Sequence, residues 1–68
     1  MQSIEQLPCR CHLVRVDAPG ERWDVYLAQA GVDASAIGRE RFESLPVARR
    51  YAKELMALYR IATLEEKL

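Results

Sequence analysis

The chain has 68 residues, of which 50% are apolar and 29% are charged, a composition typical of one small folded domain rather than a disordered segment. Ten basic residues balance ten acidic ones, so the formal net charge is zero. This balance excludes a strongly basic nucleic-acid arm, an acidic mimic of nucleic acid and a polybasic membrane anchor. An excess of arginine over lysine, with many alanines, is typical of a GC-rich bacterial or phage genome.

The length predicts a marginally stable fold, because chains below roughly 70–80 residues often need a disulfide, a metal or a partner subunit. The two cysteines, Cys9 and Cys11, are too close in sequence for a bridge that would join distant parts of the fold. We therefore expect both thiols to be reduced. Reduced thiols, and an N-terminus without a secretory signal pattern, predict a cytoplasmic protein. The longest apolar run, residues 55–59, is too short to span a membrane.

Residues 1–8 are predicted to form an N-terminal turn or a frayed tail, and residues 9–28 a β-hairpin. Alternation is imperfect over residues 9–17, which favours either a bulge or a strand with both faces partly covered. Pro19 and Gly20 supply the turn. The second strand alternates regularly, and its two faces are Trp23, Val25 and Leu27 on one side and Arg22, Asp24 and Tyr26 on the other.

Residues 29–44 admit two interpretations. A helix capped by Asp33 would carry Gly38 near its centre, at a cost of about 1 kcal/mol. A third strand over residues 35–43 would instead support the hairpin, which is barely stable by itself. We favour the strand.

A helix is predicted over residues 45–62, with an extension to residue 68 left open. Ser44 is a suitable N-cap, and Pro46 lies in the first turn, where a missing N–H is harmless. Apolar residues recur at three- and four-residue spacing through this segment. The predicted fold is therefore a single α+β domain, in which a small antiparallel meander of two to three strands packs on one long C-terminal helix, a ββ(β)α arrangement.

Cys9, Cys11 and His12 form the one cluster of soft metal ligands in the sequence. On a strand the two cysteines share a face and His12 points to the other, so a metal site would close only across a dimer. Buried free cysteines are more often small core residues, and we predict no metal and no cofactor. We also predict no catalytic residues, because no spacing sets up a nucleophile with its base and no glycine-rich phosphate loop is present.

Two kinds of binding remain. A nucleic-acid interface would use the basic residues Arg39, Arg41, Arg49, Arg50 and Lys53. Interleaved glutamates weaken that interpretation, since a nucleic-acid footprint should be basic overall.

The favoured hypothesis is a non-catalytic protein-interaction or regulatory domain, either a homodimer or a subunit or inhibitor that docks on a larger complex. One helix covers one face of a sheet, so several apolar residues (Tyr26, Ile37, Met56, Ile61, Leu64 and Leu68) have no evident place in the core. The predicted contact surface is the sheet face opposite the helix or the end of the helix around residues 61–68. Its candidate contact residues are Tyr26, Arg39, Arg41 and Tyr59.

Overall fold

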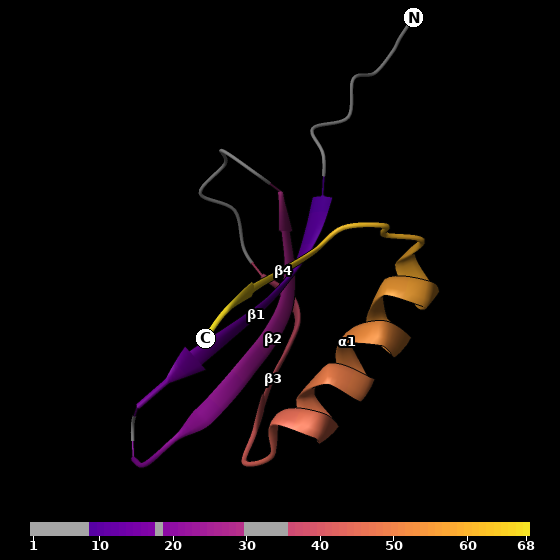
Figure 1. Ribbon diagram of the computed structural model, residues 1–68. Coiled ribbons are helices and arrows are strands. Elements are labelled where there is room, and N and C mark those ends of the chain that lie inside the picture. Colours follow the sequence, from indigo (N-terminus) through magenta and orange to yellow (C-terminus); the bar gives the residue numbers. More distant parts are fainter. Residues whose placement is uncertain (1–8, 18, 30–35) are drawn as a thin grey trace, which may run out of the picture.

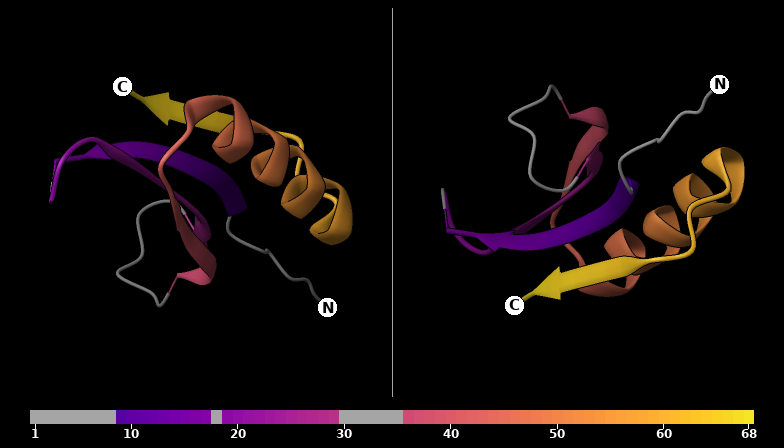
Figure 2. Two further views of the ribbon diagram at one scale, coloured as in Figure 1. Left: turned by 90° about the horizontal axis from the view of Figure 1, so that it is seen from below. Right: turned by 90° about the horizontal axis from the view of Figure 1, so that it is seen from above.

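The computed structural model describes residues 9–17, 19–29 and 36–68. Its elements follow in the order β1 (Cys9–Val16), β2 (Arg22–Gln29), β3 (Ile37–Phe42), α1 (Leu45–Tyr59) and β4 (Leu64–Lys67). The strands form one mixed sheet in the order β3-β2-β1-β4, and α1 lies across one of its faces (Figure 1). Figure 2 shows the twisted strands from below and from above, with α1 packed beside them. The α+β class and the three-stranded meander on a helix are therefore confirmed.

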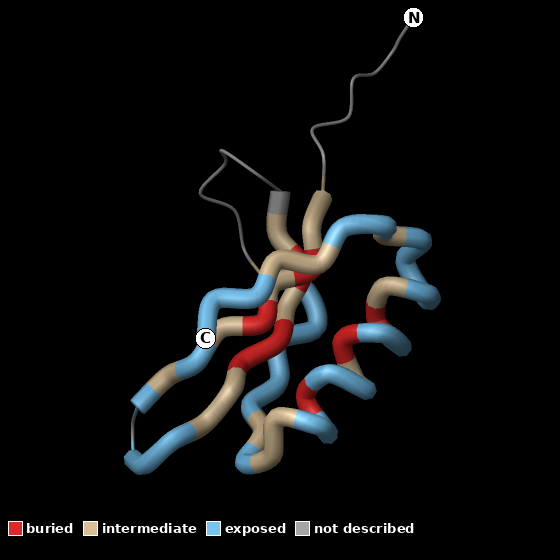
Figure 3. The backbone as a smooth tube through the Cα atoms, viewed as in Figure 1, coloured by how far each residue is buried: buried red, intermediate tan, exposed pale blue. Residues whose placement is uncertain are grey.

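The core lies between the sheet and α1, and it consists of alternate residues of β1 and β2 facing the helix. Its fully buried apolar residues are Cys11, Leu13, Val25, Leu27, Ala48, Ala52 and Leu55. Two of the three buried helix positions, Ala48 and Ala52, are alanines. Figure 3 shows the buried positions along the middle of β1 and β2 and on the sheet-facing side of the helix.

Residues 9–16 pair with β2 in one continuous register, so of the two alternatives for the first strand the bulge is absent, and both faces of the strand are partly covered. The sheet does have a bulge, but it lies in β3, where Gly38 and Arg39 together stand opposite Tyr26. Gly38 has a φ of 68°, a left-handed conformation that glycine adopts without steric cost. This bulge changes which side of the sheet each following residue of β3 faces.

The helix begins as predicted: the Val47 N–H donates to Ser44 Oγ at 3.4 Å, and Pro46 occupies the first turn. It ends at Tyr59, so the extension to residue 68 is wrong. Arg60 adopts a left-handed conformation with a φ of 57°, and the Ile61 N–H donates to the Met56 carbonyl at 2.8 Å, which closes the helix.

The chain then returns to the sheet as β4, a fourth strand that the sequence did not predict. β4 runs parallel to β1, with Leu64 opposite Cys11, and the Cys11 N–H donates to the Thr63 carbonyl at 3.0 Å. Ile61, Leu64 and Met56 pack against the core, so three apolar residues expected to lack a place have one. Ile37 and Leu68 do remain exposed.

No helix in the described part of the chain is long and apolar enough to cross a membrane. The predicted N-terminal turn over residues 1–8 and the Asp33 cap fall outside the described ranges.

Candidate functional site: the open face of the sheet

Strand alternation divides the side chains of the sheet between the side covered by α1 and an opposite side, here called the open face. Within the described ranges no helix or strand lies over the open face (Figure 2). Five residues in its centre contact one another and are here called the open-face cluster: His12, Asp24, Tyr26, Arg39 and Arg41.

Asp24 is the centre of this cluster. Its side chain is only 2% exposed, although it lies on the side away from the helix. Arg41, its neighbour across β2 and β3, donates through Nε to Oδ1 at 2.8 Å and through Nη2 to Oδ2 at 3.3 Å. Arg39 donates through Nη1 to Oδ2 at 3.2 Å. The carboxylate is thus desolvated by the two side chains that satisfy it, and its hydrogen bond to Arg41 is the main reason that the pKa of this guanidinium is raised.

Tyr26 lies between two flat groups. The His12 ring stacks on one side, with centroids 5.1 Å apart and planes at 17°, and the Arg39 guanidinium carbon lies 4.3 Å from the Tyr26 centroid. His12 and Tyr26 are directly paired across β1 and β2, while the bulge at Gly38 puts Arg39 opposite Tyr26 on the other side. The three side chains therefore form a row across three strands, held by stacking and a cation–π contact.

The row continues to β4. Glu65 Oε2 accepts from Arg10 Nη1 at 3.3 Å, and Glu65 Oε1 lies 3.4 Å from His12 Nδ1. Because β4 pairs with β1 through this part of the chain, these contacts also fix the position of the fourth strand.

Of the four predicted contact residues, the structure brings three together. Tyr26, Arg39 and Arg41 all belong to the open-face cluster, and the two arginine side chains are 53% and 50% exposed. Tyr59 lies apart from them, in the last turn of α1 beside the strongly exposed Leu58.

The candidate metal ligands are not brought together. Cys11 is fully buried, and its Sγ lies 3.9 Å from the Ala52 carbonyl oxygen. Cys9 is half-buried on the same face, whereas His12 points to the open face, as the strand pattern predicted. Burial, with a smaller contribution from Cys9, raises the pKa of the Cys11 thiol, which favours the neutral form over the thiolate that metals bind. Among the described residues no group of three or more ligand side chains could hold a metal ion.

The five basic residues of the nucleic-acid hypothesis divide between the two sides of the molecule. Arg39 and Arg41 are on the open face, whereas Arg49, Arg50 and Lys53 are on α1. Arg49 donates through Nε and Nη2 to the two oxygens of Glu66 in β4, both at 3.0 Å. This bidentate bond is the main reason that the pKa of Arg49 is raised and that of Glu66 is lowered.

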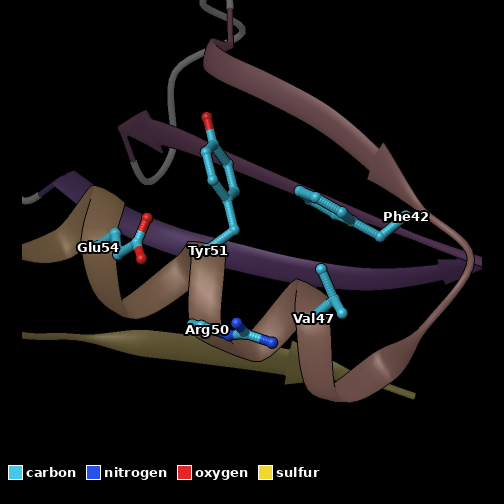
Figure 4. Close-up of a pocket in the computed structure, with 5 residues that line it drawn as sticks. All are labelled: Phe42, Val47, Arg50, Tyr51 and Glu54. Atoms are coloured by element: carbon cyan, nitrogen blue, oxygen red, sulfur yellow. The ribbon is translucent and has the colours of Figure 1, made fainter.

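An open groove of about 230 Å³ lies between α1 and β3, lined by Phe42, Val47, Arg50, Tyr51 and Glu54 (Figure 4). The Tyr51 hydroxyl donates to the Gly38 carbonyl at 2.7 Å, which ties the helix to the bulge. Desolvation first, and the nearby charge of Glu40 second, raise the pKa of Tyr51. The hydroxyl therefore stays protonated at neutral pH and acts as a structural donor.

The sequence did not predict that Asp24, His12 and Glu65 take part in the contacts on the open face. For Asp24 a signal existed. It is an acidic residue on the same strand face as Tyr26, and the next strand carries two arginines, Arg39 and Arg41, that are two residues apart and so share a face. For Glu65 there was none, because β4 itself was not predicted. Comparison with known proteins finds no matching family model, and no curated protein or solved structure matches the chain.

Proposed function

We propose that this chain is a non-catalytic binding domain that docks on a protein partner through the open face of its sheet. The observation that carries the proposal is the open-face cluster: two half-exposed arginines held by the buried Asp24, and a tyrosine that contacts His12 and one of these arginines. Tyrosine and arginine are the residue types that contribute most to protein interfaces, and their side chains lose less entropy on binding when they are already held in place.

The placement of His12 supports the non-catalytic part of the proposal. His12 and Glu65 have the imidazole–carboxylate pairing of a proton-transfer site. Serine-, threonine- or cysteine-type nucleophilic catalysis would also need an aliphatic hydroxyl or a thiol beside His12, and the cysteines are on the opposite side of β1. In the described part of β1 to β4, the open face carries no serine, threonine or cysteine.

The occupied faces of Tyr26 favour a protein over a nucleic acid. Single-stranded nucleic acids stack their bases on the free face of an aromatic ring. His12 and Arg39 cover both faces of this ring, so Tyr26 offers its edge and hydroxyl to a partner. Binding of DNA or RNA is the alternative function, and the metal-bridged dimer through Cys9 and Cys11 would require Cys11 to leave the core.

Self-association is a second candidate, and the end of α1 favours it. Leu58 is 74% exposed and Tyr59 is 49% exposed, so two large apolar side chains adjoin on the surface away from the open face. Sedimentation equilibrium over a wide concentration range tests it. A dimer that Leu58→Glu dissociates supports the homodimer, whereas a monomer at all concentrations rejects it.

The matched pair Tyr26→Ala and Tyr59→Ala tests the docking surface, since both remove one tyrosine but on different surfaces. The wild-type chain and each variant are immobilised and exposed to an extract of the source cells, and the retained proteins are quantified by mass spectrometry. We expect one or a few proteins that wild type and Tyr59→Ala retain equally and Tyr26→Ala loses. Equal retention by all three would reject the open face, and retention that nuclease abolishes would favour the nucleic-acid alternative. Two reduced cysteines support action in the cytoplasm, which fractionation of source cells checks.

A further inference from the structure

We infer that the partner presents carboxylates to the open face, so that the ligand is an acidic polypeptide segment. This inference rests on the proposed function and names the chemistry of the partner. Its basis is the uneven distribution of charged side chains: the net charge of the sequence is zero, but positive side chains outnumber negative ones on the open face.

The open face is positive although the chain as a whole is neutral. Among the described residues, the pairing registers place five cationic and two anionic side chains on this face: Arg10, Arg22, Arg39, Arg41 and Lys67 against Asp24 and Glu65. Glu43, after the end of β3, lies 3.7 Å from Arg22, and counting it still leaves a surplus of two positive charges. A face with this potential attracts anionic partners and repels cationic ones.

The two carboxylates on the face are used by the fold. Asp24 is buried beneath Arg39 and Arg41, and Glu65 is held by Arg10 and His12. The outermost groups are therefore guanidinium groups, which present several N–H donors in one plane and match a carboxylate in shape. The Arg39 guanidinium is also held against Tyr26, so it is ordered before a ligand arrives.

A second copy of this chain does not fit the same surface. In a two-fold symmetric dimer each patch meets itself, so two positive faces would be brought together and desolvated. The edge strand β3 is also a poor template for strand addition, because it has a bulge and three consecutive charged residues, Arg39 to Arg41. Both features favour a different, acidic chain that lies on the face itself.

A short poly-glutamate peptide is the probe, with poly-lysine of the same length and a single-stranded DNA oligonucleotide as comparison ligands. Each is titrated into the full ¹⁵N-labelled chain, and amide signals are followed by NMR. We expect poly-glutamate to shift the signals of open-face residues such as Tyr26 and Arg39, with an affinity that falls as salt is added. Poly-lysine should shift none of them. Absence of these shifts, or tighter binding of the oligonucleotide, would overturn the inference.

The matched variants are Arg39→Gln on the open face and Arg50→Gln on α1, which remove the same charge on opposite sides of the sheet. We expect Arg39→Gln to weaken poly-glutamate binding about fivefold, the size of one exposed charge contact, and Arg50→Gln to leave it unchanged. Lys67→Gln, which leaves the Asp24 contacts intact, should weaken it as well, and this variant covers the case in which Arg39→Gln perturbs the fold. Equal weakening by Arg50→Gln would show attraction without a site and reject the proposal.

The acidic ligand and the docking surface can be rejected independently of each other. If a cellular protein is retained in a Tyr26-dependent way and poly-glutamate neither binds nor competes, the docking surface stands and its acidic ligand is rejected. If retention does not depend on Tyr26, the proposed function fails first.

Discussion

The two faces of the sheet bury their central residues by different interactions. On the side of α1, residues such as Leu13, Val25 and Leu27 are buried by apolar packing, which is proportional to area and insensitive to direction. On the open face, Asp24 is buried to the same degree, but by two arginines whose contribution depends on hydrogen-bond geometry. Neighbouring residues of one strand thus have different roles: one side forms the apolar core, and the other holds polar side chains in fixed positions. The variants below test this difference.

The largest effect is expected from Leu13→Ala. Removing a fully buried leucine side chain typically costs about 3 kcal/mol of unfolding free energy, which is most of what a domain of this size has. Urea denaturation followed by Trp23 fluorescence measures it. The neighbouring Val14→Ala, on the open face, is the control and should cost under about 1 kcal/mol. Equal costs would mean that the two faces contribute equally to the fold.

Asp24→Asn is expected to have the next largest effect, a loss of about 2 kcal/mol of unfolding free energy. The side chain keeps its shape, but the guanidinium groups of Arg39 and Arg41 lose the negative charge between them. Added salt should recover part of this loss by screening the repulsion of the arginines. Asp17→Asn removes an exposed carboxylate paired with Arg15 and should be near neutral. If thermal melts show the two variants to be alike, Asp24 does not organise the open face.

Gly38→Ala should cost about 2 kcal/mol, since the positive φ is strained for alanine and its Cβ would lie 3.0 Å from Leu55 Cδ1. Gly20→Ala shares the positive φ, but its Cβ would meet only the flexible end of Arg22, so about 1 kcal/mol is expected. Chemical denaturation of both variants separates the backbone contribution from the contact with the helix. A Gly38 variant no worse than the Gly20 variant would show that Leu55 moves away freely.

The smallest effect concerns pH. The bond from Arg49 lowers the pKa of Glu66 in the folded state, so it stabilises the fold above the unfolded pKa of about 4.3 and is lost as pH falls below that value. Melting temperatures of wild type and Glu66→Gln should therefore differ slightly above about pH 5 and converge toward about pH 3, with a gap that salt narrows. A difference that persists at low pH would have another cause than this ion pair.

Much of the fold could be predicted because local signals and packing agree. The alternation at Trp23, Val25 and Leu27 and the Ser44 cap with Pro46 each indicate one structure, and the fold adopts it. β4 was missed because residues 64–67 contain no strand pattern. Their conformation depends on Arg60 ending the helix and on β1 offering an unpaired edge 53 positions earlier.

The site was predicted in part for the same reason. Tyr26, Arg39 and Arg41 could be chosen because strand alternation places them away from the core. Their connection through Asp24 requires the register of β2 against β3, and a bulge at Gly38 changes that register by one residue. The Tyr51 hydroxyl of α1 donates to the Gly38 carbonyl, and Leu55 lies where a side chain at position 38 would be, so the bulge is part of a tertiary arrangement that a local pattern does not contain.

The pairing of β4 with β1 has a consequence for the order of folding. Arg10 and Glu65 meet although 55 positions separate them, so this contact closes a long loop and is expected late. During synthesis, the edge of β1 that later accepts β4 therefore stays unpaired until the helix and the following segment have left the ribosome. An unpaired strand edge that carries core residues such as Cys11 and Leu13 is prone to pair with strands of other chains and to aggregate. Pairing of β4 with β1 is thus a late step that protects this edge of the sheet. Deletion of β4 should therefore first be seen as aggregation during expression.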